Sequence, residues 1–178
     1  MFRAAGYFGS GHGASIGSLC NSYIRNFTVR NVTFHGTTAA ARIKSHPGCG
    51  GHVWDVSYKD LTMHDVPTAV QLNQFYFAKP GDPPSAMRFE RIHFSNITSY
   101  HAGGGSAGSG GDTESQHESV INLDCDTKFN GKNNCDVTFD DVHFVGLSAK
   151  QQKDGMTCKG VRGTAVGLTG IHSCLEEQ

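Results

Sequence analysis

The stretch from Ile24 to Phe34 reads IRNFTVRNVTF, and the stretch from Val53 to Met63 reads VWDVSYKDLTM, with apolar residues at identical offsets. In both, the apolar residues alternate at period two, are interrupted by two polar residues, and then alternate again. This pattern is typical of two short β-strands joined by a tight corner. Two further copies occupy residues 89–97 and 137–144. The same strand pattern therefore occurs four times along the chain, and a repeat of this kind constrains the fold.

The four copies are separated by loops of different length. Their homologous positions Phe27, Val56, Ile92 and Val137 are 29, 36 and 45 residues apart. The polar corner pairs are Arg30-Asn31, Lys59-Asp60, Ser95-Asn96 and Asp140-Asp141. A further strand is predicted after each copy, at residues 41–44, 70–73, 120–123 and 165–168. Repeats of about 20 to 50 residues built from short strands indicate a β-solenoid, whereas a β-propeller blade needs a fourth strand that the pattern lacks.

The composition favours a single turn-rich all-β domain over residues 1–178. The chain has 23 glycines, 17% charged residues and no stretch with the pattern of an amphipathic helix. Most of residues 102–116 are Gly, Ala and Ser, which predicts a flexible loop. The net charge of -1 provides no overall field to attract nucleic acid or an anionic membrane, so neither is expected as a partner.

Six cysteines and three glycosylation sequons, at Asn26, Asn31 and Asn96, suggest an oxidising, secreted setting. Buried thiols and chance sequons are the alternative. The first residues lack the apolar core of a signal peptide, so an export signal would lie upstream of Met1. No two cysteines have the C-x-x-C spacing and no two histidines lie within five residues, so neither a metal site nor a cofactor is expected.

The most specific segments are Gly11-His12-Gly13 and, 30 residues later, Arg42-Ile43-Lys44. Together, in this order and within this strand repeat, they resemble the Gly-His-Gly and Arg-Ile-Lys motifs of the polygalacturonases, glycoside hydrolase family 28. The resemblance runs from about Gly6 to the C-terminus. It implies the C-terminal portion of a right-handed, single-stranded parallel β-helix that is secreted to the cell wall, hydrolyses α-1,4-galacturonosyl linkages of pectin, and is monomeric when full length.

The resemblance also implies roles for four residues. His12 lies at the active site in the family, and its flanking glycines let backbone and substrate approach closely. Arg42 and Lys44 point to the same face of a strand, which predicts two cations side by side on the surface. They suit a polymer with one carboxylate per sugar, although a solvated strand face is the alternative. Tyr76 stands where the family tends to have the Tyr of Asp-Gln-Asn-Tyr, which lines a sugar subsite, although a buried structural tyrosine is equally compatible.

The family's catalytic aspartates have no counterpart here. An inverting glycosidase needs a carboxylic acid and a carboxylate base. In the family both come from motifs that precede Gly-His-Gly, but only 10 residues precede Gly11 and none is acidic. The pair Asp140-Asp141 stands at a corner of the repeat, where it is turn chemistry. We therefore expect an N-terminally truncated chain that does not cleave pectin by itself and, with an uncapped end, aggregates when isolated.

The resemblance pairs Cys125 with Cys135 and Cys158 with Cys174, as in the small disulfides near the C-terminus of the family, and leaves Cys20 and Cys49 paired or free. Two other functions stay open. A pectate lyase can share the β-helix, but the two motifs speak against it. A non-catalytic remnant that binds pectin, or serves only a structural purpose, is the second.

Overall fold

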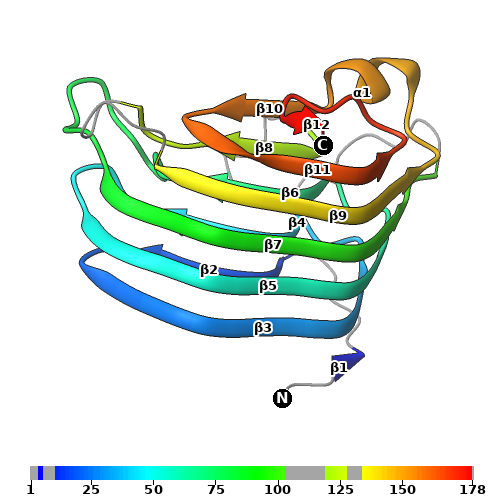
Figure 1. Ribbon diagram of the computed structural model, residues 1–178, viewed down its shortest axis with the longest axis horizontal. Coiled ribbons are helices and arrows are strands. Elements are labelled where there is room, and N and C mark those ends of the chain that lie inside the picture. Colours follow the sequence, from blue (N-terminus) through cyan, green and yellow to red (C-terminus); the bar gives the residue numbers. More distant parts are fainter. Residues whose placement is uncertain (1–3, 6–10, 103–118, 128–133, 178) are drawn as a thin grey trace.

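Two parallel β-sheets face each other across the interior of the molecule (Figure 1). The computed structural model describes residues 4–5, 11–102, 119–127 and 134–177. The long sheet has the order β1-β3-β5-β7-β9-β11-β12, and the short sheet the order β10-β8-β6-β4-β2. The expected all-β parallel β-helix is therefore confirmed.

The long sheet comprises β1 (Ala4–Ala5), β3 (Ser22–His35), β5 (Gly50–His64), β7 (Ala86–Tyr100), β9 (Cys135–Val145), β11 (Val161–Thr169) and β12 (Glu176–Glu177). The short sheet comprises β2 (His12–Leu19), β4 (Ala39–Ser45), β6 (Thr68–Asn73), β8 (Ile121–Asp124) and β10 (Met156–Lys159).

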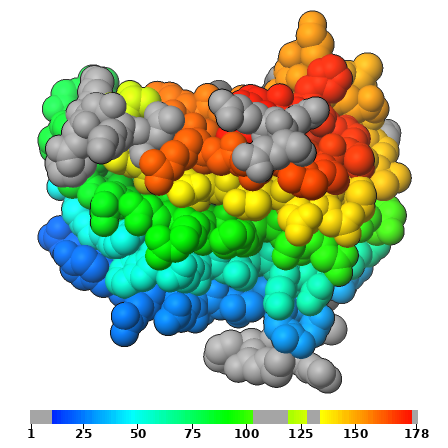
Figure 2. Space-filling view, viewed as in Figure 1, coloured from blue at the N-terminus to red at the C-terminus, as the bar shows by residue number. Residues whose placement is uncertain are grey.

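Successive copies of the repeat lie in register in the long sheet. Phe27 pairs with Val56, Val56 with Ile92, and Ile92 with Val137. The unequal offsets between copies are therefore coil lengths, and the loops absorb the difference while the strands stay aligned. The coils follow one another as coloured bands across the face seen in Figure 2.

The predicted corners are left-handed residues within the long strands. Asn31, Asp60, Asn96 and Asp141 have φ of 55, 54, 49 and 56°. Asn and Asp tolerate this conformation better than other non-glycine residues. Sheet pairing continues across the corner, so the two short strands expected in each copy form one bent strand. A second left-handed position, which the sequence did not reveal, lies five residues earlier at Asn26, Asp55 and Arg91.

A strand covers residues 165–168, as predicted, but it is not the counterpart of the strands at residues 41–44, 70–73 and 120–123. These residues lie in β11 of the long sheet, where Ala165 pairs with Phe139, and Gly167 is the corner with φ of 65°. The short-sheet strand of this coil is β10, which pairs with β8. Its sequence, MTCK, contains only one β-branched residue, whereas residues 161–169 carry a stronger apolar pattern. The other three predicted strands fall in β4, β6 and β8.

Rows of side chains stacked from coil to coil fill the interior. Tyr58, Phe94 and Phe139 are 0% exposed, and their ring centroids lie 5.4 and 4.9 Å apart along the row. Ile43 and Leu72 face them from the short sheet and are equally buried. Because each coil covers the next, adjacent coils supply most of the apolar contact. Burial raises the pKa of the Tyr58 phenol above its ordinary value, so its hydroxyl stays protonated.

Three disulfides lie at or near the ends of strands. Cys125–Cys135 and Cys158–Cys174 match the pairing that the resemblance implied, and Cys20–Cys49, left open by the sequence, is also bonded. Helix α1 (Ala149–Asp154) begins with a Ser148 capping box and buries none of its residues. Most of the loop predicted to be flexible, residues 103–116, lies outside the described residues. No helix in the described ranges is long and apolar enough to cross a membrane.

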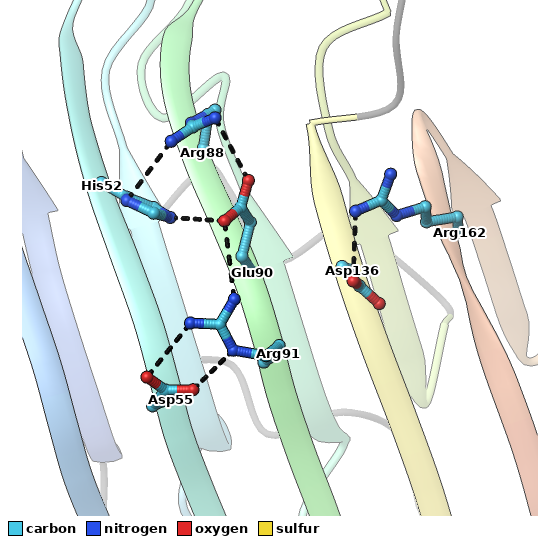
Figure 3. Close-up of polar contacts among 7 residues, drawn as sticks. All are labelled: His52, Asp55, Arg88, Glu90, Arg91, Asp136 and Arg162. Carbon is cyan, nitrogen blue, oxygen red and sulfur yellow. Dashed lines mark hydrogen bonds and ion pairs between the residues drawn. The ribbon is translucent and has the colours of Figure 1, made fainter.

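Ion pairs join neighbouring coils on the outer face of the long sheet (Figure 3). Glu90 lies 2.9 Å from His52 and 3.3 Å from Arg88, and Arg91 binds Asp55 at 2.6 Å. Arg162 pairs with Asp136 in the next two strands. Exposed pairs of this kind contribute little stability. They do give Arg88, Arg91 and Arg162 acidic partners on this face.

Candidate functional site

The two sequence motifs lie on adjacent strands of the short sheet. Strand β2 begins at His12 and pairs in parallel with β4, so Ser15 lies beside Arg42 and Ile16 beside Ile43. Packing explains the second glycine of Gly-His-Gly, because a Cβ at Gly13 would lie 2.6 Å from the Phe34 ring and 2.7 Å from the Ala40 carbonyl oxygen. Glycine here lets β2 approach both neighbours.

His12 is held between Thr38 and Arg42. Its Nδ1 lies 2.8 Å from Thr38 Oγ1, and Thr38 donates to the Gly11 carbonyl oxygen at 3.1 Å. Arg42 Nη1 lies 2.7 Å from His12 Nε2 and 3.2 Å from Nδ1. Because arginine can only donate, Nε2 accepts from Arg42 and the ring proton lies on Nδ1, which donates to Thr38 Oγ1; the 3.2 Å approach of Arg42 to Nδ1 is then a contact and not a hydrogen bond. The histidine and arginine predicted from separate motifs therefore meet.

Arg42 and Lys44 extend to the same side of β4, as predicted, while Ile43 packs in the core at 0% exposure. The prediction that they lie on the surface is wrong, since Arg42 is 2% and Lys44 7% exposed. The ring of Tyr76 lies over both, 3.8 Å from Lys44 Nζ and 5.3 Å from the Arg42 guanidinium carbon. A buried cation needs a compensating partner, and an aromatic face provides one.

Tyr76 belongs to a loop that follows β6. Its backbone N–H donates to the Ser45 carbonyl oxygen at 3.1 Å, and the Phe75 N–H donates to Asn73 Oδ1 at 2.7 Å. His46 Nδ1 lies 3.0 Å from the Tyr76 carbonyl oxygen. These bonds fix the backbone of the loop against the end of β4, so all four predicted site residues gather in one place.

Several neighbours of the site were missed by sequence reasoning. Thr38 orients His12, and His46 continues the period-two series of Arg42 and Lys44 along the chain, a signal that the sequence did contain. Lys159 lies in the same cross-strand row as Lys44, through Asn73 and Asp124, and its Nζ lies 4.4 Å from the Phe75 ring centroid. Sequence reasoning missed Lys159 because it did not identify β10 as a strand of the short sheet.

Acidic residues are scarce around this site. In the five described strands of the short sheet, Asp124 is the only acidic residue, and it pairs with Lys159 at 3.0 Å. Asp141 lies at a left-handed corner of the long sheet, as expected from the repeat. Among the described residues, no group of three or more His, Cys, Asp or Glu side chains could hold a metal ion. The arrangement is suited to holding an anion rather than to general acid–base chemistry by a carboxylate pair.

Comparison with known proteins finds several polygalacturonases among the relatives of this chain. Polygalacturonase-2 of Solanum lycopersicum is 27% identical over 157 residues, covering 86% of this chain and 31% of that protein. A polygalacturonase of Prunus persica is 29% identical over 173 residues, covering 94% of this chain and 39% of that protein. An endo-polygalacturonase of Pectobacterium parmentieri is 35% identical over 92 residues, covering 52% of this chain and 22% of that protein.

The chain thus spans less than two fifths of the length of these relatives, and no solved structure matches it. The family model of the glycosyl hydrolases family 28 matches residues 3–169, which include both motifs and all four long strands that carry the repeat. The chain therefore belongs to glycosyl hydrolases family 28.

Proposed function

We propose that the outer face of the short sheet binds a polygalacturonate chain, and that this site is part of a pectin hydrolase of the polygalacturonase type. The observation that carries the proposal is the pair Arg42 and Lys44 on one strand, in contact with His12 and Tyr76. A guanidinium fork with an adjacent ammonium suits the carboxylates of a polyuronide. The relatives are named polygalacturonases, which supports polygalacturonate as the ligand. Membership of a hydrolase family disfavours the lyase alternative.

Access to the two cations depends on Tyr76. Its ring covers both, whereas the backbone of its loop is fixed by hydrogen bonds. Rotation of this side chain would open the site without moving the loop. A carboxylate would then replace the aromatic face as the partner of Lys44, which is a stronger interaction for a desolvated ammonium.

The isolated chain is expected to bind without cleaving. Acid–base hydrolysis of a glycosidic bond requires two carboxyl groups flanking it. Within the described strands of the short sheet, Asp124 alone could contribute, and Lys159 engages it. A non-catalytic pectin-binding remnant, which is the alternative function, would also bind the polymer without cleaving it. Release of reducing ends from polygalacturonic acid by the pure 178-residue chain would overturn this part of the proposal.

A secreted, glycosylated form remains a prediction. Three disulfides favour an oxidising compartment. Asn26, Asn31 and Asn96 are exposed at left-handed turns, where an attached glycan would not disturb the core. Mass spectrometry of the chain secreted from a eukaryotic host would detect the glycans.

The binding proposal is tested by titrating the chain with trigalacturonate. Arg42→Lys keeps the charge but removes the fork, and Lys44→Met removes the charge but keeps the apolar stem. Each should weaken binding about tenfold or more, because a charge-assisted hydrogen bond contributes about 1.5–3 kcal/mol. Lys59→Met, at a corner of the long sheet, is the control and should bind normally. Unchanged affinity in both site variants would refute the proposal.

A further inference from the structure

The loop after β6 carries a second aromatic side chain, Phe77, directly beside the candidate site. Phe77 is 64% exposed, although a large apolar side chain at the surface costs free energy in water. Its ring centroid lies 4.1 Å from that of Tyr76, on which Lys44 packs. An exposed aromatic ring therefore adjoins the covered cations.

The backbone of Phe77 is strained. Its φ is 57°, a left-handed value that is an outlier for a bulky residue and that, elsewhere in the described residues, only Asn, Asp, Gly and one Arg adopt. Its neighbours hold it there, since Ala78 N–H donates to the Phe75 carbonyl oxygen at 2.9 Å and Tyr76 N–H donates to Ser45. The conformation turns the chain so that consecutive aromatic residues remain adjacent, and a strained residue next to a candidate site calls for a functional explanation.

His46 provides a polar group beside the exposed ring. Its ring centroid lies 6.5 Å from that of Phe77 and 5.4 Å from that of Tyr76. Its Nδ1 donates to the Tyr76 carbonyl oxygen, because a carbonyl can only accept, and this bond fixes the ring and leaves Nε2 for a ligand. An apolar platform with a polar group at its side is the usual composition of a small-molecule subsite.

We propose that Phe77, with His46 beside it, forms a stacking subsite for the galacturonosyl ring adjacent to the one whose carboxylate is held by Arg42 and Lys44. The C–H groups on one face of a pyranose ring pack on the electron-rich face of an aromatic ring. His46 Nε2 then hydrogen-bonds a hydroxyl group of the same sugar. The inference rests on the proposed function, since the occupant is the next unit of the same polymer.

The subsite predicts a dependence on ligand length. Trigalacturonate reaches the Phe77 ring, whereas galacturonate occupies the cation site alone. Phe77→Leu keeps an apolar side chain but removes the ring, and should weaken trigalacturonate binding about fivefold while leaving galacturonate binding unchanged. Phe77→Trp should retain trigalacturonate affinity within about twofold. Tyr100→Ala is the matched control, because Tyr100 is another exposed aromatic residue, 44% exposed, at the far end of β7.

NMR titration of the 178-residue chain distinguishes the outcomes. Equal trigalacturonate affinity in the unaltered chain and Phe77→Leu overturns the stacking subsite but leaves the cation site intact. An equal loss for both ligands in Phe77→Leu also overturns it, since the ring would then only support the loop. Binding of neither ligand by the unaltered, folded chain overturns the proposed function and the subsite with it.

Discussion

Strand β3 and the inner strands β5 and β7 carry the same sequence pattern but bury it to different extents. Phe27 in β3 is 38% exposed, whereas its register partner Val56, and Ile92, which pairs with Val56, are 0% exposed. Strand β5 has a full-length neighbour on each side, but β1, on the other side of β3, pairs only through Ala4 and Ala5. The pattern determines which side of a strand faces inward, and the neighbouring coils determine whether that side is buried.

The largest expected difference between these regions concerns core side chains. Phe94→Ala should lower the free energy of unfolding by about 4 kcal/mol, because the ring is 0% exposed and is stacked between Tyr58 and Phe139. Phe27→Ala in β3 should cost about 1 kcal/mol, since this ring is partly exposed already. Urea unfolding followed by circular dichroism measures both. Equal costs would show that β3 is as well covered as the inner coils.

Substitutions of the corner residues should cost the same stability in β3 as in β7. Asn31 in β3 and Asn96 in β7 both have left-handed backbones, with φ of 55 and 49°. Replacing either with Ala should cost about 1–2 kcal/mol, because Ala lacks the short polar side chain whose local hydrogen bonding lets Asn tolerate the left-handed conformation. Glycine at either position should cost much less. A much larger cost at Asn96 than at Asn31 would mean that its bond to Asp60, at 2.8 Å, dominates instead.

A smaller effect is expected from Tyr58→Phe in β5. The Tyr58 hydroxyl lies 3.1 Å from the Arg42 carbonyl oxygen and 3.3 Å from that of Ala14, across the core from the long sheet. Its loss should cost about 1 kcal/mol at pH 7, and Phe94 and Phe139 show that phenylalanine fits this row.

The cost should also depend on pH. Burial raises the folded-state pKa of Tyr58, so its contribution is complete below the unfolded value of about 10 and declines as pH rises above it. The unaltered chain should therefore lose stability faster than Tyr58→Phe above about pH 10. Parallel alkaline slopes would contradict the assignment of this hydroxyl.

The smallest effect concerns the surface pair Asp55 and Arg91. Asp55→Asn makes β5 resemble β3, which has Asn26 at the equivalent left-handed position. The hydrogen bond from Arg91 holds the pKa of Asp55 below its ordinary value of 3.8, so its contribution is present above that pH and lost as pH falls through the lowered value. The urea midpoint of Asp55→Asn should be slightly lower at pH 7 and equal in strong acid. A large loss at pH 7 would show that the network of Figure 3 is cooperative.

The long sheet was predictable because its information is local and repeated. Alternation and corner residues in Ile24–Phe34 recur in each copy, so the register of Phe27, Val56, Ile92 and Val137 follows from aligning the copies with one another. The short strands hold four to eight residues. The four residues of β10 are too few to show a period. The sequence pattern therefore predicted the further strand of the last copy at residues 165–168, which belong to β11.

Which residues gather at the candidate site was predictable from the sequence, but their burial was not. Resemblance to the two polygalacturonase motifs singled out His12, Arg42 and Lys44, and period two along β4 placed the two cations together. Their burial could not be inferred, because the covering ring of Tyr76 comes from the next coil, about 30 residues later in the sequence. Phe77 was missed because nothing in a sequence indicates that a phenylalanine will adopt a positive φ.

The unequal coil lengths have an evolutionary consequence. Coils of 29 and 45 residues share one strand register, so residues can be inserted between strands without displacing a core side chain. The chain-closure entropy of the longer coil exceeds that of the shorter by only about 0.4 kcal/mol. Selection can therefore lengthen or shorten the loops bordering the short sheet at almost no thermodynamic penalty. The β-helix thereby separates the stacked strands, which hold the core in register, from the loops, whose length can change.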